Sequence, residues 1–415
     1  MKSNILCSLA LLICISSCHN KESGDKKNVN ALSDTLTYSL PEEVGMSASK
    51  IKEAENLFLN AVEENKVLGY QILVARKGKV VLHKAGGIRD LKNNLPMHKN
   101  TLINVASNTK SLVAISILKL ADEGKLSLDD YVSKYLNGFD SLFSSEITIK
   151  QLLLHKGGFM SFATFQGEII QNSLEEPEAP SLIVEARKIG KVGPEVKPGT
   201  KYRYSNLGYN VLGAIVEKVS NMKLDIYFKE NIYKPLGMNE TVHHLKDIDT
   251  SRLSKQYYLY NGRWELMDVL YTPFARANAG TISTAWDFAI LFQMLVNKGS
   301  YNNNKILKEK TVVEATTPII EVSEAYLSEE IEKSLGLPSS EWYEYRDARE
   351  LNIDKHRGYG FVVSDNGGYS HAGIYGTFAY ADPKENLIVI IFTQSIYGGN
   401  PGQKFIETIY EAINR

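Results

Sequence analysis

The spacing of hydrophobic residues changes twice along the chain and divides it into β-rich ends and a helical middle. Apolar residues recur at helical spacing over 46–65, which predicts the first helix. β-branched and aromatic residues then dominate 70–75 and 80–85, and the Arg-Lys-Gly-Lys sequence between these runs predicts a β-hairpin. From 101 to about 299 the spacing is mainly helical, with helices predicted at 107–123, 148–154, 182–188, 208–219, 224–232 and 284–297.

Strand-like sequence returns near the C-terminus. Strands at both ends with helices between them predict an α+β fold, in which both chain ends form one antiparallel sheet flanked by helices and the mainly helical region of about 101–299 is inserted. The site is expected where the sheet meets this insertion. Two long stretches, 162–197 and 320–357, predict lids or extra helices. The predicted C-terminal strands are 358–364, 368–371, 377–382 and 387–393, followed by a helix over 403–413.

The N-terminus has the pattern of a secretory signal peptide over residues 1–17. Lys2 precedes the apolar run 5–15, which is too short for a permanent membrane-spanning helix, and small residues follow it. The boundary Ile-Ser-Ser-Cys resembles a bacterial lipobox, and this resemblance implies that Cys18 becomes the lipidated first residue of the mature protein. In the alternative reading, Cys18 is incidental to an ordinary cleaved signal.

Cysteine content and charge narrow the class of protein further. All 3 cysteines lie in the leader, so the globular domain expected over 38–415 has no thiol for a disulfide. The polar residues 18–37 lack periodicity and predict a flexible tether. The 47 basic and 48 acidic residues are balanced, which argues against a nucleic-acid-binding protein. We expect an exported lipoprotein, anchored in a membrane through Cys18 and facing the periplasm or the cell surface.

A hydroxyl and an amine stand three residues apart at the start of a predicted helix. Residues at this spacing share one helix face, so Lys110 could accept the proton of Ser107 or hold its alkoxide by charge. The Ser-x-x-Lys pattern is a nucleophile signature of penicillin-interacting enzymes, because a serine needs a neighbouring base to become reactive. Taken alone, the pair is more typical of an ordinary helix start followed by a surface lysine.

Two later motifs supply further candidate chemistry. After a Pro-Gly turn, Tyr204 is a candidate general base or acid, since nearby positive charge favours a phenolate. Asn206 could offer its amide to a substrate carbonyl or to Lys110, or it could simply cap a turn or helix. Further on, His371-Ala372-Gly373 lies in a predicted strand with glycines where a backbone must come close to a ligand.

With these pieces in this order, the chain resembles the class C β-lactamase-like serine hydrolases, a family that also contains penicillin-binding carboxypeptidases, D-aminopeptidases and esterases. The resemblance extends from about Tyr38 to the C-terminus. Its other landmarks are Leu-Leu-Leu-His-Lys-Gly-Gly at 152–158, with Gly157 where serine is usual, Pro-Leu-Gly-Met at 235–238 and Ala-Gly-Thr-Ile-Ser-Thr-Ala at 279–285.

The resemblance implies an enzyme that works through an acyl-enzyme. In that mechanism Ser107 attacks, Lys110 and Tyr204 shuttle protons, and water releases the acyl group. The N–H groups of Ser107 and Ile374 would form the oxyanion hole, with Asn206, His371 and Gly373 beside the substrate. No metal ion or organic cofactor is implied. We expect a monomer acting on a small-molecule or peptide substrate.

The third motif departs from that of many lactam-cleaving relatives. They carry Lys-Thr-Gly, whereas His371 and Ala372 stand here, and neutral histidine is a poorer carboxylate anchor than lysine. His-x-Gly resembles the D-aminopeptidases and some esterases of the family, so we predict a small ester, an amide or a D-amino-acid peptide as substrate. The alternatives are a β-lactamase or D-Ala-D-Ala carboxypeptidase, for which a loop arginine such as Arg276 would supply the charge, and a non-catalytic peptidoglycan- or penicillin-binding sensor.

Three other features are predicted to be structural. Ser370 lies in a near match to the Gly-x-Ser-x-Gly elbow, but that motif needs a helix where a strand is predicted to follow. His155 is expected to be a hydrogen-bonded structural residue. His243 and His244 are expected in a solvent-exposed loop, since adjacent histidines point apart and no acidic or cysteine cluster completes a metal site.

Overall fold

The computed structural model of the protein describes residues 35–141, 143–159, 179–244, 249–267, 272–322, 356–396 and 399–414. The predicted signal peptide and Cys18 lie outside these ranges, as do 160–178 and 323–355, which belong to the two long stretches. Among the described residues, no helix has both the length and the apolar character needed to cross a bilayer.

Strands from both ends of the chain form one main sheet. Its strands are β1 (Thr37–Tyr38), β2 (Gly69–Arg76), β3 (Lys79–Asp90), β4 (Leu95–Pro96), β11 (Ile320–Glu321), β12 (His356–Arg357), β13 (Val362–Val363), β14 (Tyr369–Gly373), β15 (Thr377–Asp382) and β16 (Leu387–Thr393). Their order in the described part of the chain is β1-β3-β2-β16-β15-β14-β13-β12-β11, with β4 paired to β3. β1 and β3 run parallel, and the β2–β16 pair that joins the two chain ends is antiparallel. The predicted α+β class is confirmed.

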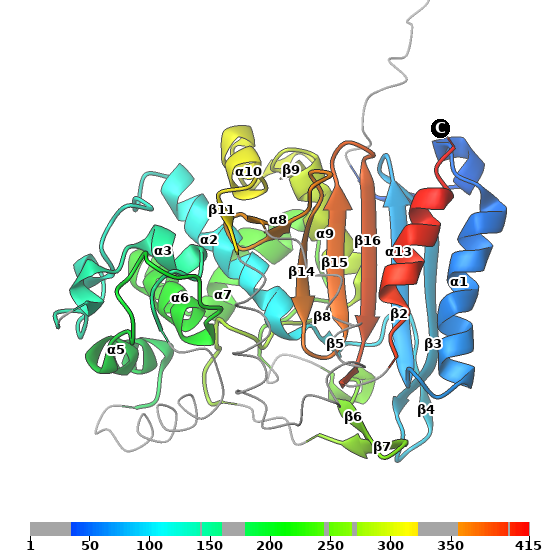
Figure 1. Ribbon diagram of the computed structural model, residues 1–415, viewed down its shortest axis with the longest axis horizontal. Helices are drawn as coiled ribbons and strands as arrows, with labels where there is room; N and C mark the ends of the chain where they lie inside the picture. Colours follow the sequence, from blue (N-terminus) through cyan, green and yellow to red (C-terminus); the bar gives the residue numbers. More distant parts are fainter. Residues whose placement is uncertain are drawn as a thin grey trace, which may run out of the picture. The chain divides into compact units, whose positions relative to one another are not determined.

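Helices cover both faces of this sheet (Figure 1). α1 and α13 lie on one face, while α2 and α9 lie on the other, toward the helical insertion. The helices are α1 (Ala48–Glu63), α2 (Thr109–Asp122), α3 (Ile149–Leu153), α5 (Leu182–Val192), α6 (Asn206–Ser220), α7 (Leu224–Phe228), α8 (Lys234–Leu236), α9 (Ala285–Val296), α10 (Glu309–Ala315) and α13 (Gly402–Glu411).

Successive residues of the central strands point into two different cores. In β16, Leu387 and Val389 pack in the core beneath α1 and α13, whereas Ile388 and Ile390 pack in the core that contains α2, α6 and α9. This alternation follows from the two-residue repeat of a strand. Each such side chain stabilises the folded state by about 1.5–3 kcal/mol when it is fully buried. Because both faces are covered, β16 reads as an unbroken apolar run rather than an alternating one.

Most predicted elements are present, with shifted ends. The hairpin predicted around 76–79 is the β2–β3 pair, in which Arg76 lies opposite Lys79. A second hairpin, β6 (Tyr257–Tyr260) with β7 (Arg263–Leu266), was not predicted, and neither was α10. The hairpin turns at Asn261 and Gly262, which both have positive φ, so an Asn-Gly turn signal was present in the sequence.

The strand predicted over 358–364 is wrong for its first half. Only Val362–Val363 is strand, because the preceding residues form a turn that packs on α2. Gly360 has φ +82, and a Cβ there would lie 2.4 Å from the Cβ of Ala114. A side chain on this backbone would therefore clash, and the glycine lets the β12–β13 hairpin contact the helix that follows Ser107.

The prediction of an exposed loop at His243 is also wrong. The side chain of His243 is 3% exposed and packs edge-on against Phe228. Its Nε2 lies 2.8 Å from the carbonyl oxygen of Arg276 and its Nδ1 lies 2.8 Å from the hydroxyl of Thr281. Since a carbonyl only accepts, Nε2 carries the hydrogen and Nδ1 accepts from the hydroxyl. These partners are distant in sequence, so the local pattern did not reveal the burial.

Candidate active site

Ser107 lies in a tight turn immediately before α2. The turn is a short 3-10 segment, Ala106–Asn108, and Ala106 has φ +48, a conformation that costs energy for a residue with a side chain. The N–H of Ala106 donates to Oδ1 of Asn104 at 2.9 Å. The buried amide of Asn108 donates to the carbonyl and hydroxyl oxygens of Thr377 at 3.2 and 3.1 Å. These bonds hold the turn against β15 with Ser107 half-buried.

Lys110 is fully buried beside Ser107. Its Nζ lies 2.9 Å from Oγ of Ser107 and donates to the carbonyl oxygen of Asn278 at 2.8 Å. Burial holds the pKa of the Lys110 ammonium well below its usual range. The neutral amine is therefore more populated than in an exposed lysine, and its lone pair can accept the Ser107 proton.

Tyr204 approaches this pair from the segment that leads into α6. Nζ of Lys110 lies 4.9 Å from the centroid of the Tyr204 ring. Asn206 is the first residue of α6, but the cap is Ser205, whose hydroxyl accepts the N–H of Gly208. The alternative reading of Asn206 as a helix cap is thus contradicted. Its Oδ1 is buried and accepts no hydrogen bond from any described residue.

The strand β14 brings His371 and Gly373 to the same place. A Cβ on Gly373 would lie 2.4 Å from the carbonyl oxygen of Val105, so the missing side chain lets the end of β14 approach the Ser107 turn. Ile374 follows in the turn after β14 and is half-buried. Burial lowers the pKa of His371 to about 3, so its imidazole is neutral at pH 7.

Comparison with known proteins identifies the family. A profile of the Beta-lactamase family matches residues 54–407. The chain belongs to the beta-lactamase family. It is 27% identical over 396 residues to a Salmonella schwarzengrund (strain CVM19633) protein named "Putative D-alanyl-D-alanine carboxypeptidase", with 86% of this chain and 85% of that protein covered.

Solved structures show the same fold. EstCE1, described as a hydrolase with promiscuous acyltransferase activity, matches with a TM-score of 0.71 and 21% identity, covering 88% of this chain and 99% of EstCE1. The octameric penicillin-binding protein homologue from Pyrococcus abyssi matches with a TM-score of 0.66 and 25% identity, covering 87% of this chain and 76% of that one. This member of the beta-lactamase family is therefore a serine hydrolase by family and fold.

Two arginines of this beta-lactamase-family protein are candidates for a positive charge near the site. Nη2 of Arg276 lies 2.6 Å from Oε1 of the buried Glu185, so its charge is balanced within the protein. Arg357, on β12, was not singled out from the sequence. Its Nε donates to the Tyr202 hydroxyl at 3.3 Å, and its charge contributes to lowering the pKa of His371. Arg357 thus places a cation within electrostatic reach of the site.

Two residues behind Lys110, Asn278 and Asn210, were not singled out from the sequence. The lysine is held by the backbone carbonyl of Asn278, and any residue type has such a carbonyl. Oδ1 of Asn210 accepts the N–H groups of Ala277 and Asn278 at 3.1 and 2.9 Å and fixes that carbonyl. The available clue was a polar residue on the buried side of α6.

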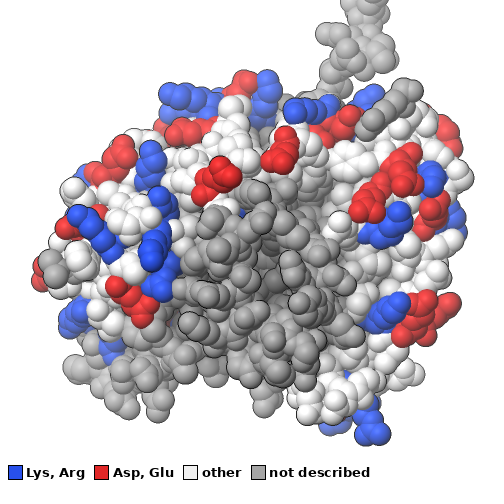
Figure 2. All heavy atoms as spheres, viewed as in Figure 1, with Lys and Arg blue, Asp and Glu red and all other residues white. Residues whose placement is uncertain are grey.

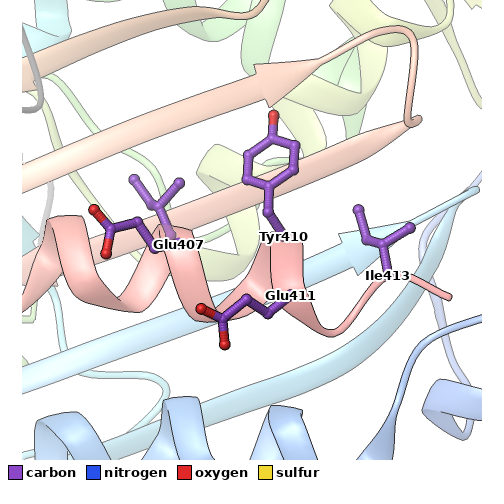
Figure 3. Close-up of a pocket in the computed structure, with 5 residues that line it drawn as sticks. Glu407, Tyr410, Glu411 and Ile413 are labelled. Carbon is purple, nitrogen blue, oxygen red and sulfur yellow. The ribbon is translucent and has the colours of Figure 1, made fainter. Parts of the chain in front are cut away.

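A surface hollow on α13 lies away from this chemistry. Figure 3 shows Tyr410 pointing toward the sheet while Glu407 and Glu411 point elsewhere, and the other lining residues are Ile406 and Ile413. The hydroxyl of Tyr410 donates to Oδ2 of Asp382 at 2.6 Å, which ties α13 to β15. Since α13 and α2 cover opposite faces of the sheet, this hollow is not the Ser107 site.

The described part of the face in Figure 2 carries no large patch of a single charge sign. Lys and Arg side chains are interspersed with Asp and Glu over the described part of this face. Where both signs alternate on a surface, the long-range field of that surface is small.

Proposed function

We propose that this protein forms an acyl-enzyme on Ser107 and hydrolyses a small ester, an amide or a D-amino-acid-containing peptide. One observation carries the proposal: Oγ of Ser107 lies 2.9 Å from Nζ of the fully buried Lys110. An exposed lysine would be protonated at pH 7 and could not act as a base. Burial lowers the pKa of Lys110 and so favours its neutral amine, and a hydroxyl within hydrogen-bond distance of an amine is the geometry that proton transfer needs.

In the first half-reaction, Oγ of Ser107 bonds to the substrate carbonyl carbon while Lys110 accepts the serine proton. Tyr204 passes a proton to the leaving group as the bond between that group and the carbonyl carbon breaks. In the second half-reaction, water attacks the acyl carbon, gives a proton back through the same residues and frees Ser107. We place the developing oxyanion on the N–H groups of Ser107 and Ile374, because Gly373 allows β14 to approach the Ser107 turn.

The neutral state of His371 supports a substrate without a carboxylate at that position. With its pKa lowered to about 3, this imidazole offers no positive charge to bind one at pH 7. Its Nδ1 lies 2.9 Å from the carbonyl oxygen of Ala372 and donates to it, which leaves Nε2 as an acceptor. Neutral esters and amides therefore suit this side of the site best.

A second candidate is D-Ala-D-Ala carboxypeptidase activity. The Salmonella relative carries that name, and Arg357 places a cation near His371. The two candidates differ on a matched pair of peptides, one ending in D-Ala-D-Ala and one in its C-terminal amide. Carboxylate recognition by Arg357 would give the free acid a preference of about 10- to 150-fold, equal to 1.5–3 kcal/mol, and Arg357→Gln would abolish it. A neutral-substrate enzyme shows no such preference.

We further propose export and lipid anchoring, from the sequence pattern. Residues 1–17 would be the signal peptide, Cys18 the lipidated first residue, and 18–37 a tether to the hydrolase domain of 38–415, whose helical subregion spans about 101–299. The enzyme would face the periplasm or the cell surface and act as a monomer.

The decisive experiment is covalent labelling of purified protein with a fluorophosphonate and with a fluorescent penicillin. Ser107→Ala should abolish labelling, and Ser370→Ala should retain it, because Oγ of Ser370 is buried in β14. Labelling that persists in Ser107→Ala refutes the assignment. Multiple turnover of a chromogenic ester by the same preparation separates a hydrolase from a sensor, since a sensor would keep its acyl group after one reaction.

A further inference from the structure

His155 lies directly against Tyr204 and is not used in the mechanism above. It follows α3 with φ +54, a left-handed conformation that histidine adopts more readily than most residues but still at a cost. The side chain is 8% exposed, so it is built into the site rather than lying on the surface. Its conformation directs both its carbonyl and its ring to the segment that carries Tyr204.

The backbone on both sides of Tyr204 is bonded to His155. The carbonyl oxygen of His155 accepts the N–H of Arg203 at 2.8 Å, and its Nδ1 accepts the N–H of Ser205 at 3.0 Å. A backbone N–H can only donate, so Nδ1 is unprotonated and the neutral ring carries its hydrogen on Nε2. Burial, with a smaller contribution from the charge of Arg357, holds the pKa of His155 well below its usual range. The ring therefore keeps this acceptor at pH 7.

The imidazole also supports the phenol ring of Tyr204. The two ring centroids lie 4.4 Å apart at an interplanar angle of 32°. The ring of Tyr209 lies 4.9 Å from the same imidazole, and the Tyr209 hydroxyl donates to the carbonyl of Leu153 at 3.1 Å. Tyr204 is thus held through its backbone neighbours and through its ring, at the point where its ring faces Nζ of Lys110.

We propose that His155 is a positioning residue for Tyr204, which it holds in register with Lys110 through the Ser205 bond and the ring contact. This inference rests on the proposed function, in which Tyr204 carries protons. Proton transfer needs heavy atoms about 2.6–3.2 Å apart, and a misplacement of about 1 Å costs about 100-fold in rate. A loss of His155 should therefore reduce kcat with little change in KM.

Two substitutions of His155 tolerate its backbone conformation but differ in whether they can accept the hydrogen bond from the Ser205 N–H. His155→Gly removes the side chain, and glycine accepts φ +54 without strain. His155→Asn also tolerates that φ and places Oδ1 where Nδ1 stood, so it can accept the Ser205 N–H. We expect His155→Gly to lose about 100-fold in kcat for a chromogenic ester and His155→Asn to recover about 10-fold of that. The matched control is His83→Asn. His83 is a buried histidine of β3 that is hydrogen-bonded to the Tyr38 hydroxyl, and its substitution should leave kcat at the wild-type value.

A double-variant cycle tests whether the effect passes through Tyr204. In a Tyr204→Phe background, which keeps the ring and removes the hydroxyl, His155→Gly should change kcat by less than about threefold. A loss of about 100-fold in both backgrounds, or a loss confined to KM, would overturn the positioning role. Melting temperatures of all variants identify a folding defect. Turnover that survives Ser107→Ala refutes the proposed function itself, whatever the His155 variants do.

Discussion

Gly373→Ala tests whether the close approach of β14 to the Ser107 turn matters for catalysis. The added Cβ would lie 2.4 Å from the backbone carbonyl of Val105 and 2.3 Å from the hydroxyl of Thr377. Real Cβ atoms essentially never approach within 3.0 Å, so β14 and the turn must separate by at least about 0.6 Å at the Val105 carbonyl. The Thr377 hydroxyl cannot yield freely, because it donates to the same carbonyl at 2.9 Å.

That separation is large compared with the tolerance of an oxyanion hole. Its donors must lie about 2.7–3.1 Å from the developing charge, and removing one donor costs about 2.7–4 kcal/mol, or a factor of 10² to 10³ in kcat. If the N–H of Ile374 is one of the donors, Gly373→Ala should show a loss in that range. KM should change much less, since the donor acts mainly in the transition state.

The assay is steady-state hydrolysis of a chromogenic ester, with the melting temperature measured in parallel. Gly208→Ala is the matched control, because a Cβ there would lie 3.5 Å from the Leu152 side chain, an ordinary contact, and alanine favours the helix. Gly208→Ala should retain wild-type kcat. A folded Gly373→Ala with unchanged kcat would refute the reasoning, because the oxyanion donors would then not depend on this approach.

Three further predictions concern the base, the anchor and acid stability. Lys110→Ala and Tyr204→Phe should each slow acylation by about two to four orders of magnitude, measured by single-turnover kinetics. Cys18→Ser should release the protein from the membrane fraction or block its processing, measured by fractionation. The free energy of unfolding should fall as pH drops from 6.5 to about 4, because burial lowers the pKa values of His83 and His243 to about 4. The unfolded chain binds protons in that window and the folded one does not, which costs at most about 3 kcal/mol per histidine; urea titrations at each pH measure it.

Each of these predictions has a result that contradicts it. Wild-type turnover from either Lys110→Ala or Tyr204→Phe would mean that protons take another path. Unchanged fractionation of Cys18→Ser would favour an ordinary cleaved signal. Asp287 opposes this loss of stability at low pH. Burial raises its pKa to about 6, so between about pH 6 and 3.8 the folded state binds a proton on Asp287 that the unfolded chain does not. Asp287→Asn should therefore steepen the loss of stability, and a flatter profile would contradict the assignment.

Local patterns along the chain were sufficient for most of the helices, the main strands and the proximity of Ser107 and Lys110. Helical periodicity placed Lys110 one turn after Ser107, and the structure has their polar atoms 2.9 Å apart. Such a contact follows from helix geometry alone, because residues three apart share a face whatever surrounds them. The C-terminal strands were also recognisable from local sequence. A strand that is buried on both faces contains few polar residues and so appears as an apolar run.

Only the tertiary structure decided which distant groups complete the site. The carbonyl of Asn278 against Lys110, the N–H of Ser205 on His155 and the approach of Gly373 to Val105 each join segments that are far apart in sequence. Backbone groups are identical in every residue, so no composition or spacing identifies which of them will meet. The lowered pKa values of Lys110 and His371 likewise became evident only once burial was known, because desolvation depends on everything packed around a group and not on its sequence neighbours.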